Sequence, residues 1–335
     1  FPSLLHRTTP FIVSMKTPIA RVGKNILFYD ENRFNEWMTT HVNDKVKVKY
    51  YKGLGTTKTE DVADTFGTKM VEYVHDDDAN DNMNKIFNKA NPDDRKKWLG
   101  NYKPGTSIFS LDDQPVFTQM SITDFMNGEM IKFSHSDCGR SIPNGIDGLK
   151  ESQRKILYAV RKRKLRYTGT SLKVAQLSGY TAEHSNYHHG EQNLQDTMIG
   201  MAHDFVGSNN IPLLYRDGQF GSRLDGGNDA ASARYIFTKM DRLTEFIYRD
   251  EDDAILTYVN DDGDTVQPEY YVPIIPMILV NGCLGIGTGW SSTIPCYNPS
   301  EMIESIKTWL DNDGNVFERD EDGDVEISMF DDLIP

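Results

Sequence analysis

Cysteine is scarce in this sequence, and none of the cysteines is paired in a C-x-x-C spacing. Cys138, Cys283 and Cys296 are the three cysteines among the 335 residues. An odd number of widely separated cysteines argues against a disulfide framework, and the absence of C-x-x-C argues against a cysteine zinc site. A reducing, intracellular compartment fits this cysteine usage.

Long apolar runs are also missing. The longest candidate, residues 270–280 (YYVPIIPMILV), contains two prolines and is shorter than the roughly 20 residues that span a membrane. The first residues, FPSLLHRTTPF, lack an initiator methionine, a basic n-region and a small-residue cleavage site. We therefore expect no membrane partner and no signal peptide, and we expect the chain to be part of a longer protein.

The chain has no overall positive charge, because 36 Lys and Arg residues are outnumbered by 50 Asp and Glu residues, for a net charge of −14. Such a balance usually counts against a nucleic-acid partner, since phosphates are neutralised by clustered cations. Residues 131–174, however, hold eleven Lys or Arg residues and three acidic residues. One basic segment in an acidic chain is typical of a localised polyanion site, although a solvated helix face is the alternative.

The order of sequence patterns predicts a multidomain protein of α/β plus α+β class. Residues 24–52 have the pattern strand, helix, strand, which is typical of the last part of an α/β domain. A stretch rich in proline, glycine and turn residues over 103–117 predicts a boundary near residues 105–120. From about residue 243, strands and glycine or proline turns predominate. These changes divide the chain into residues 1–118, 119–245 and 246–335.

The middle segment is predicted to be mainly helical. Ser121 is an N-cap candidate at its start, and residues 191–205 carry apolar side chains at helical spacing before a glycine-rich loop and a strand over 234–240. Helices followed by a strand and loops resemble a winged-helix module, which is a DNA-binding fold.

The helix predicted over residues 148–165 is amphipathic. Its apolar face is formed by Leu149, Ile156, Leu157 and Val160, and an adjacent flank is formed by Lys150, Arg154 and Arg161. A helix of this kind packs on one side and presents positive charge on the other. We expect Lys150 and Arg154 to face a polyanion.

Two histidines precede another predicted helix start. His188 and His189 lie immediately before residues 191–205, where unpaired N–H groups and the helix dipole favour an anion such as phosphate. A metal site with His184 and Glu191 is a second interpretation, although no H-E-x-x-H motif is present. A third interpretation is that the two histidines only cap the helix or pack against neighbouring side chains.

The stretch GIGTGW, residues 285–290, is too short and wrongly spaced for the dinucleotide motif G-x-G-x-x-G. A tight loop that allows close backbone approach is better supported. Ile286 on such a loop is a candidate wedge of the kind that enters base steps. Without further evidence, an isoleucine is more commonly a buried core residue than a wedge.

The pair Arg234–Tyr235 follows a run of small residues. A tyrosine phenol has a pKa of about 10, so as a nucleophile it needs nearby cations that favour the phenolate. Arg234 keeps its charge and matches a phosphate bidentately. The pair therefore suits attack on a phosphodiester, although Arg-Tyr dipeptides are common and usually structural.

Taken together, these stretches resemble the DNA breakage-reunion region of eukaryotic-type type IIA DNA topoisomerases, a form also carried by some large DNA viruses. The resemblance covers nearly the whole chain. Its motifs occur in the following order: YYKGLGT (50–56), RSIPNGIDGLKESQRKILYA (140–159), YHHGEQNL (187–194), FVGSNNIPLL (205–214), GQFGSRLDGGNDAASARYIF (218–237) and PMILVNGCLGIGTGWSSTIPCYNP (276–299).

The resemblance implies catalytic roles for four residues. Tyr235 would attack a backbone phosphate and form a 5'-phosphotyrosyl link, while Arg234 would clamp the scissile phosphate. Arg140 would lie near the cleaved strand, and His189 would donate a hydrogen bond to the reacting phosphate. The residues implied to bind DNA are Lys52, Lys150, Arg154, His188 and the wedge Ile286.

The resemblance also implies a domain identity for each segment. Residues 1–118 would be the C-terminal part of a Toprim domain with a linker, 119–245 a winged-helix domain, and 246–335 the start of a strand-rich tower domain. Mg²⁺ would be bound by residues upstream of Phe1, so no metal ligand is expected in this chain, and ATP would be bound by a separate N-terminal domain.

The whole protein is then expected to be a homodimer that cuts double-stranded DNA and passes a second duplex through the break. Relaxation and decatenation of DNA would follow, with ATP hydrolysis. The expected location is the nucleus for a cellular protein, and the host cell or virion for a viral one. The alternatives are a winged-helix DNA-binding protein without catalysis and a histidine-based metallohydrolase.

Overall fold

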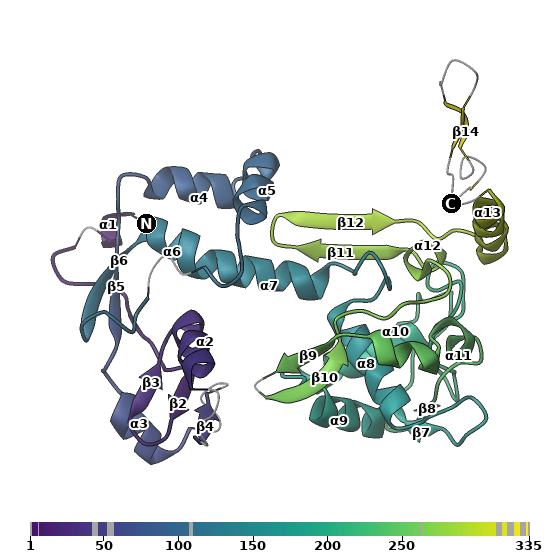
Figure 1. Ribbon diagram of the computed structural model, residues 1–335, viewed down its shortest axis with the longest axis horizontal. Coiled ribbons are helices and arrows are strands. Elements are labelled where there is room, and N and C mark those ends of the chain that lie inside the picture. The colour runs from purple at the N-terminus through teal and green to yellow at the C-terminus, as the bar shows by residue number, and fades with distance from the viewer. Residues whose placement is uncertain are drawn as a thin grey trace. The chain divides into compact units, whose positions relative to one another are not determined.

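A computed structural model describes residues 2–5, 7–41, 46–51, 57–106, 110–261, 263–312, 317–319, 325–328 and 333. The chain forms two compact units, residues 1–137 and 138–335 (Figure 1). The finer boundaries after residues 118 and 245 stay predictions. Within the described ranges, no helix is both long enough and apolar enough to cross a membrane. The three cysteines carry free thiols.

The strand, helix and strand predicted over residues 24–52 are confirmed in the first unit. Strand β2 (Ala20–Val22) lies between β3 (Ile26–Phe28) and β4 (Val48–Tyr50) in an antiparallel sheet. Helix α2 (Glu31–Thr40) begins after Asp30, whose carboxylate accepts hydrogen bonds from two N–H groups of the first turn, at 3.0 and 3.2 Å. The buried side chains of Phe28 and Phe34 join the sheet and the helix in a small core.

A second sheet in this unit joins β1 (Val13–Met15), β5 (Met70–Val74) and β6 (Phe117–Ser121), with β5 antiparallel to β1 and parallel to β6. Further helices of this unit are α1 (Pro2–Leu5), α3 (Thr59–Thr65), α4 (Ala79–Phe87) and α5 (Pro92–Gly100). Residues 88–91 separate α4 from α5. Pro92 lies at the first position of α5, where its missing N–H has no partner to lose.

Ser121 caps α6 (Ile122–Phe125), as predicted, because its hydroxyl accepts a hydrogen bond from the Asp124 N–H at 2.9 Å. The helix continues through a π-helical segment, Met126–Met130, into α7 (Ile131–Ser141).

The second unit is organised around three helices that contact one another: α8 (Glu151–Lys162), α9 (Val174–His184) and α10 (Glu191–Met201) (Figure 1). Their inner faces form the largest apolar core, in which side chains such as Ile156, Leu177 and Met198 are fully buried. Strands β7 (Leu172–Lys173) and β8 (Phe237–Thr238) pair beside them. Helix α11 (Thr244–Ile247) and a 3-10 helix (Asp250–Ile255) follow.

The strand-rich texture expected after residue 243 is confirmed as a series of hairpins. They pair β9 (Tyr258–Asp261) with β10 (Asp264–Pro268), β11 (Cys283–Gly287) with β12 (Trp290–Ile294), and β13 (Phe317–Arg319) with β14 (Val325–Ser328). Two helices interrupt the series, the short α12 (Met277–Val280) and α13 (Pro299–Asp311).

A buried carboxylate organises the start of α8. Asp147 is fully buried, and Arg154 donates to its two oxygens from Nε at 2.7 Å and from a terminal guanidinium nitrogen at 3.0 Å. The N–H groups of Leu149 and Tyr271 also donate to this carboxylate, at 2.9 and 3.0 Å. Arg154 therefore does not present its charge on an exposed flank, and the expectation that it contacts a polyanion directly is wrong.

Other members of the basic segment are also paired within the unit. Arg161 donates to the carbonyl of Tyr248 and to Asp253, and Arg166 pairs with Asp250. The acidic run at residues 250–253, which is separate from the basic segment in the sequence, thus neutralises part of it in the fold. Only a subset of the eleven cations remains for an external anion.

We expect Asp147→Ala to lower the free energy of unfolding by about 3–5 kcal/mol, because it leaves the buried Arg154 guanidinium without its counter-charge. Urea denaturation measures this value. Asp204→Ala is the matched control, since Asp204 pairs with Arg216 at the surface, where a pair contributes below about 1 kcal/mol. Equal losses in the two variants would contradict the role given to Asp147.

Candidate functional site

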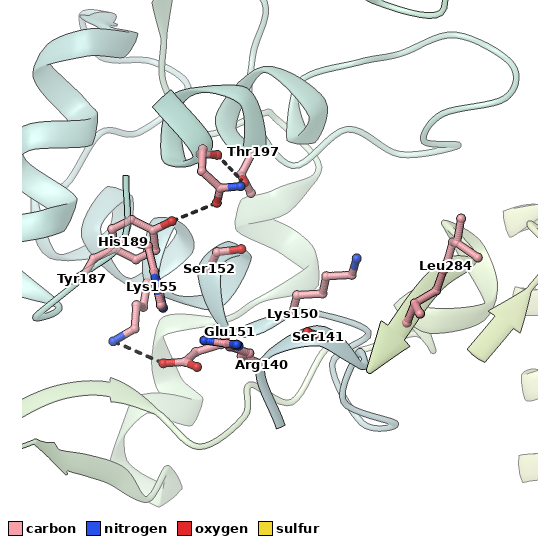
Figure 2. Close-up of a pocket in the computed structure, with 12 residues that line it drawn as sticks. Arg140, Ser141, Lys150, Glu151, Ser152, Lys155, Tyr187, His189, Thr197 and Leu284 are labelled. Carbon is pink, nitrogen blue, oxygen red and sulfur yellow. Dashed lines mark hydrogen bonds and ion pairs between the residues drawn. The ribbon is translucent and has the colours of Figure 1, made fainter. Parts of the chain in front are cut away.

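A cleft of about 750 Å³ lies in the second unit (Figure 2). It brings together four of the residues singled out from the sequence: Arg140, Lys150, His189 and Ile286. The other lining residues are Ser141, Glu151, Ser152, Lys155, Tyr187, Asn193, Thr197 and Leu284. The cleft therefore combines basic, hydroxyl and amide side chains with two aliphatic ones.

Lys150 is held at the cleft by the turn that precedes α8. Its N–H donates to the side-chain oxygen of Gln153 at 2.9 Å, so residue 150 is the N-cap of the helix. Gly148 has a φ of +69°, and a Cβ there would lie 2.7 Å from the Ile278 nitrogen. Glycine is thus required for the close approach of this turn to α12. Within the described part of the chain, no hydrogen-bond or ion-pair partner is found for the Lys150 ammonium group.

Lys155 also lines the cleft but is tied to the protein. Its ammonium group donates to the Ser185 carbonyl at 2.5 Å and to the Gln267 side chain at 3.1 Å, and it pairs with Glu151 at 3.6 Å (Figure 2). Glu151 is therefore a compensated negative charge in a mainly positive cleft. Lys155 joins α8 to the segment before α10.

His188 and His189 lie on the exposed segment that enters α10, as predicted. The His189 ring packs edge-to-face on the Tyr187 ring, with 5.3 Å between centroids. The Tyr187 hydroxyl donates to the Asn193 side chain at 2.9 Å. Burial, followed by the charge of Glu151, raises the pKa of Tyr187, so this phenol stays a hydrogen-bond donor.

The two histidines occupy different surroundings. His189 lines the main cleft, whereas His188 lines a neighbouring pocket of about 290 Å³ that also includes His189, Glu151 and residues of the β9–β10 hairpin. The His184 ring packs against the Tyr180 ring at a tilted angle within α9, with ring centroids 4.1 Å apart. Among the described residues, no group of three His, Cys, Asp or Glu side chains is placed to hold a metal ion. No described residue is therefore given a metal-ligand role.

The glycine-rich stretch around residue 286 is a β-hairpin rather than the expected tight loop. Gly285 packs so closely on residues 141–143 that a Cβ would lie 2.8 Å from the Ser141 carbonyl oxygen. A Cβ on Gly287 would lie 3.1 Å from the Cys138 Cα and Sγ. Because alternate residues of a strand point to opposite faces, Ile286 faces away from this contact, and its side chain is 72% exposed.

Arg234 and Tyr235 lie on a turn that leads into β8, and neither residue lines the cleft. Both are exposed, Tyr235 to 73%. Their neighbours Ala233 and Ile236 are buried in the core of the unit, and the Tyr235 N–H donates to the Ser232 carbonyl at 2.9 Å. The backbone of this turn is therefore anchored on both sides while the two side chains project outward.

The small residues before Arg234 have a packing role. A Cβ on Gly227 would lie 2.3 Å from the His203 ring, and one on Gly221 would lie 2.5 Å from the Gly227 carbonyl oxygen. Both glycines also have positive φ angles. The loop before the tyrosine is thus folded tightly on itself and on His203.

Sequence reasoning missed Leu284 and Tyr187 as cleft residues. The alternation of glycine with larger side chains in CLGIG, residues 283–287, was an available signal for a strand with Leu284 and Ile286 on one face. Tyr187 carried no such signal, because its contacts depend on how the segment before α10 folds. Lys52, expected to bind DNA, lies outside the described residues.

Comparisons with known proteins agree over most of the chain. Residues 140–320 match the A-subunit family of DNA gyrase/topoisomerase IV, and residues 12–138 match the C-terminal associated domain of TOPRIM. The chain is 47% identical over 315 residues to DNA topoisomerase 2 of Invertebrate iridescent virus 6, an alignment that covers 90% of this chain and 27% of that protein. It is 48% identical over 319 residues to a probable DNA topoisomerase 2 of Dictyostelium discoideum, covering 93% and 20%.

A solved structure is also similar, the Plasmodium falciparum topoisomerase II DNA-binding, cleavage and re-ligation domain. The TM-score is 0.78 at 44% identity, and the match covers 93% of this chain and 42% of that one. The chain spans roughly a fifth to a quarter of the length of the two curated relatives, as their 20% and 27% coverage shows.

We expect Gly285→Ala to lower the free energy of unfolding by about 1–3 kcal/mol, because the added methyl group overlaps the Ser141 carbonyl and the Pro143 ring. Gly145→Ala is the control, since a Cβ there has no atom within 4 Å and the change should stay within about 0.5 kcal/mol. Thermal and urea denaturation compare the two. A neutral Gly285→Ala would argue against close packing of β11 on residues 138–143.

Proposed function

The chain belongs to the type II DNA topoisomerases, and we propose that it forms part of the DNA breakage-reunion region of such an enzyme. The observation that carries this proposal is the cleft in which Arg140, Lys150, His189 and Ile286 meet. Two cations, an imidazole and an exposed aliphatic side chain suit a bent DNA backbone. The alternative of a DNA-binding protein without catalysis lacks such support, since a solved relative is a cleavage and re-ligation domain.

In the proposed reaction, the Tyr235 oxygen attacks a backbone phosphorus and forms a phosphotyrosyl bond to the 5' side of the break. The bond from phosphorus to the 3'-oxygen breaks, one proton leaves the phenol, and the 3'-oxygen takes up one proton. One phosphodiester replaces another, so the reverse attack by the 3'-hydroxyl restores the strand without ATP at that step. The exposure of Tyr235 supports this role, because the DNA must reach and leave the phenol.

The positive groups would act by neutralising charge on the reacting phosphate. The side chains of Arg234 and Tyr235 project from the same anchored turn, so Arg234 would lie near the phosphate that Tyr235 attacks. Its guanidinium can donate hydrogen bonds to two phosphate oxygens. Arg140, Lys150 and His189 would hold the DNA backbone and donate to the phosphate oxygens. His188 would bind DNA beside His189 from the neighbouring pocket.

The remaining properties belong to the longer protein. We infer a homodimer that acts on double-stranded DNA, relaxes and decatenates it, and depends on ATP and Mg²⁺ bound outside these residues. The separation of the Arg234–Tyr235 turn from the cleft is compatible with an active site assembled from two subunits. The relatives are viral and eukaryotic, so we infer a nuclear location for a cellular protein and the host cell or virion for a viral one.

We expect Tyr235→Phe to abolish covalent attachment of protein to DNA. The full-length protein is mixed with Mg²⁺ and supercoiled DNA, stopped with denaturant, and the adduct is measured by gel shift after nuclease treatment. Tyr270→Phe, a change at another exposed tyrosine, is the control and should keep the adduct. An adduct of normal yield in Tyr235→Phe would overturn the assignment of the nucleophile.

We expect Lys150→Ala to weaken DNA binding and to reduce the slope of log K against log salt by about 0.9, the contribution of one phosphate contact. Lys307→Ala, on the exposed face of α13 and paired with Glu304, should leave the slope unchanged. Fluorescence anisotropy at several salt concentrations measures both. An unchanged slope in Lys150→Ala would show that Lys150 makes no contact with a DNA phosphate.

A further inference from the structure

Leu284 is an exposed aliphatic residue that the proposed function does not yet use. Its side chain is 63% exposed, yet it lines the same cleft as Arg140 and Lys150 (Figure 2). It is two residues before Ile286 on β11, so both side chains project from the same face of the strand. An isolated exposed leucine needs no explanation, but one beside a wedge in a basic cleft does.

The direction of Leu284 is fixed by the packing of its neighbours. Gly285 and Gly287 press the other face of β11 against residues 138–143, and the Cys138 thiol donates to the Thr288 carbonyl at 3.2 Å. In the antiparallel register, Leu284 lies opposite Thr293 and Ile286 lies opposite Ser291. Opposite residues share a face, and both hydroxyl residues are exposed. The outer face of the hairpin thus has two aliphatic side chains beside two hydroxyl groups.

The spacing of this face suits the edge of a DNA duplex. Residues i and i+2 of a strand lie about 6.8 Å apart, from a rise of about 3.4 Å per residue. Successive base pairs are separated by about 3.4 Å along each strand. When Ile286 enters a base step from the minor groove, Leu284 therefore reaches the groove edge about two base pairs to one side.

The chemistry of that edge differs between the two kinds of base pair. In the minor groove, A·T pairs present only acceptors, whereas G·C pairs add the guanine amino donor. A leucine pressed on that amino group removes its water and offers no acceptor in return, which is unfavourable. A leucine over an A·T pair covers acceptors of the kind that a G·C pair also carries, but it avoids the additional cost of the covered amino group.

We propose that Leu284 is a specificity-determining residue that makes the cleavage site favour A·T over G·C beside the step that Ile286 enters. This inference rests on the proposed DNA cleavage function. It assigns sequence preference to a side chain outside the catalytic set.

The test maps covalent cleavage by the full-length protein on a library of duplexes randomised around the scissile positions, with sequencing of the protein-linked ends. The wild type should favour A·T at one position on one side of the opened step by about fivefold. Leu284→Ala should reduce that preference below about twofold. Leu284→Asn, whose amide oxygen accepts from the guanine amino group, should move the preference toward G·C.

Leu310→Ala is the matched control, because Leu310 is 62% exposed on α13 and lies outside the cleft. Its cleavage profile should equal that of the wild type. Ile286→Ala should reduce the DNA bend, measured by energy transfer between labelled duplex ends, whereas Leu284→Ala should largely keep it. An unchanged A·T preference in Leu284→Ala would overturn this inference alone. Absence of any wild-type adduct would overturn the proposed function, and this inference with it.

Discussion

The buried carboxylate of Asp147 is the constraint on which the geometry of the cleft depends. It receives hydrogen bonds from Arg154 on α8, from the Leu149 N–H and from the Tyr271 N–H, and so joins three segments. Removing an ion pair from water is favourable only when the remaining oxygen positions are filled, and here they are. Because this junction fixes the turn before α8, Lys150 begins the helix at the cleft, and Gly148 lies in close contact with Ile278 of α12.

The hairpin β11–β12 presents exposed aliphatic side chains beside the cleft. One face of β11 carries Gly285 and Gly287 and packs closely against residues 138–143. The side chains between them are then forced outward, although burial would stabilise them by about 1.5–3 kcal/mol each. The exposure of Leu284 and Ile286 is thus a consequence of packing on the opposite face. Exposure of these side chains to water is unfavourable, and the proposed contact with DNA would cover them.

Local sequence patterns predicted the helices and strands well. They could not predict which charged side chains of the site pair with residues far away in the sequence. The cap at Ser121 and the placement of His189 before α10 depend on neighbouring residues, so both were predictable. The flank shared by Lys150 and Arg154 was misleading, because helical periodicity gives the direction of a side chain around the axis but not its depth or its partner. Arg154 meets the buried Asp147 in the first turn of α8, whereas Lys150, at the N-cap of the same helix, lines the cleft. In the same way, the acidic run at 250–253 meets Arg161 and Arg166 only in the folded chain.

The residues that hold the fold and the residues proposed for the chemistry are largely different, and the reversibility of the proposed reaction gives a reason. When a DNA strand is cut and rejoined, the same groups must be positioned around the phosphate in both steps. The reactive residues therefore need a fixed backbone and accessible side chains. Tyr235 has this arrangement, because buried Ala233 and Ile236 anchor its turn while its phenol is exposed. Lys150 has it as well, as the N-cap of a buried helix. The buried charges of Asp147 and Arg154 thus supply rigidity, whereas the exposed phenol of Tyr235 and the half-buried side chain of Lys150 stay accessible for the proposed contact with the DNA backbone.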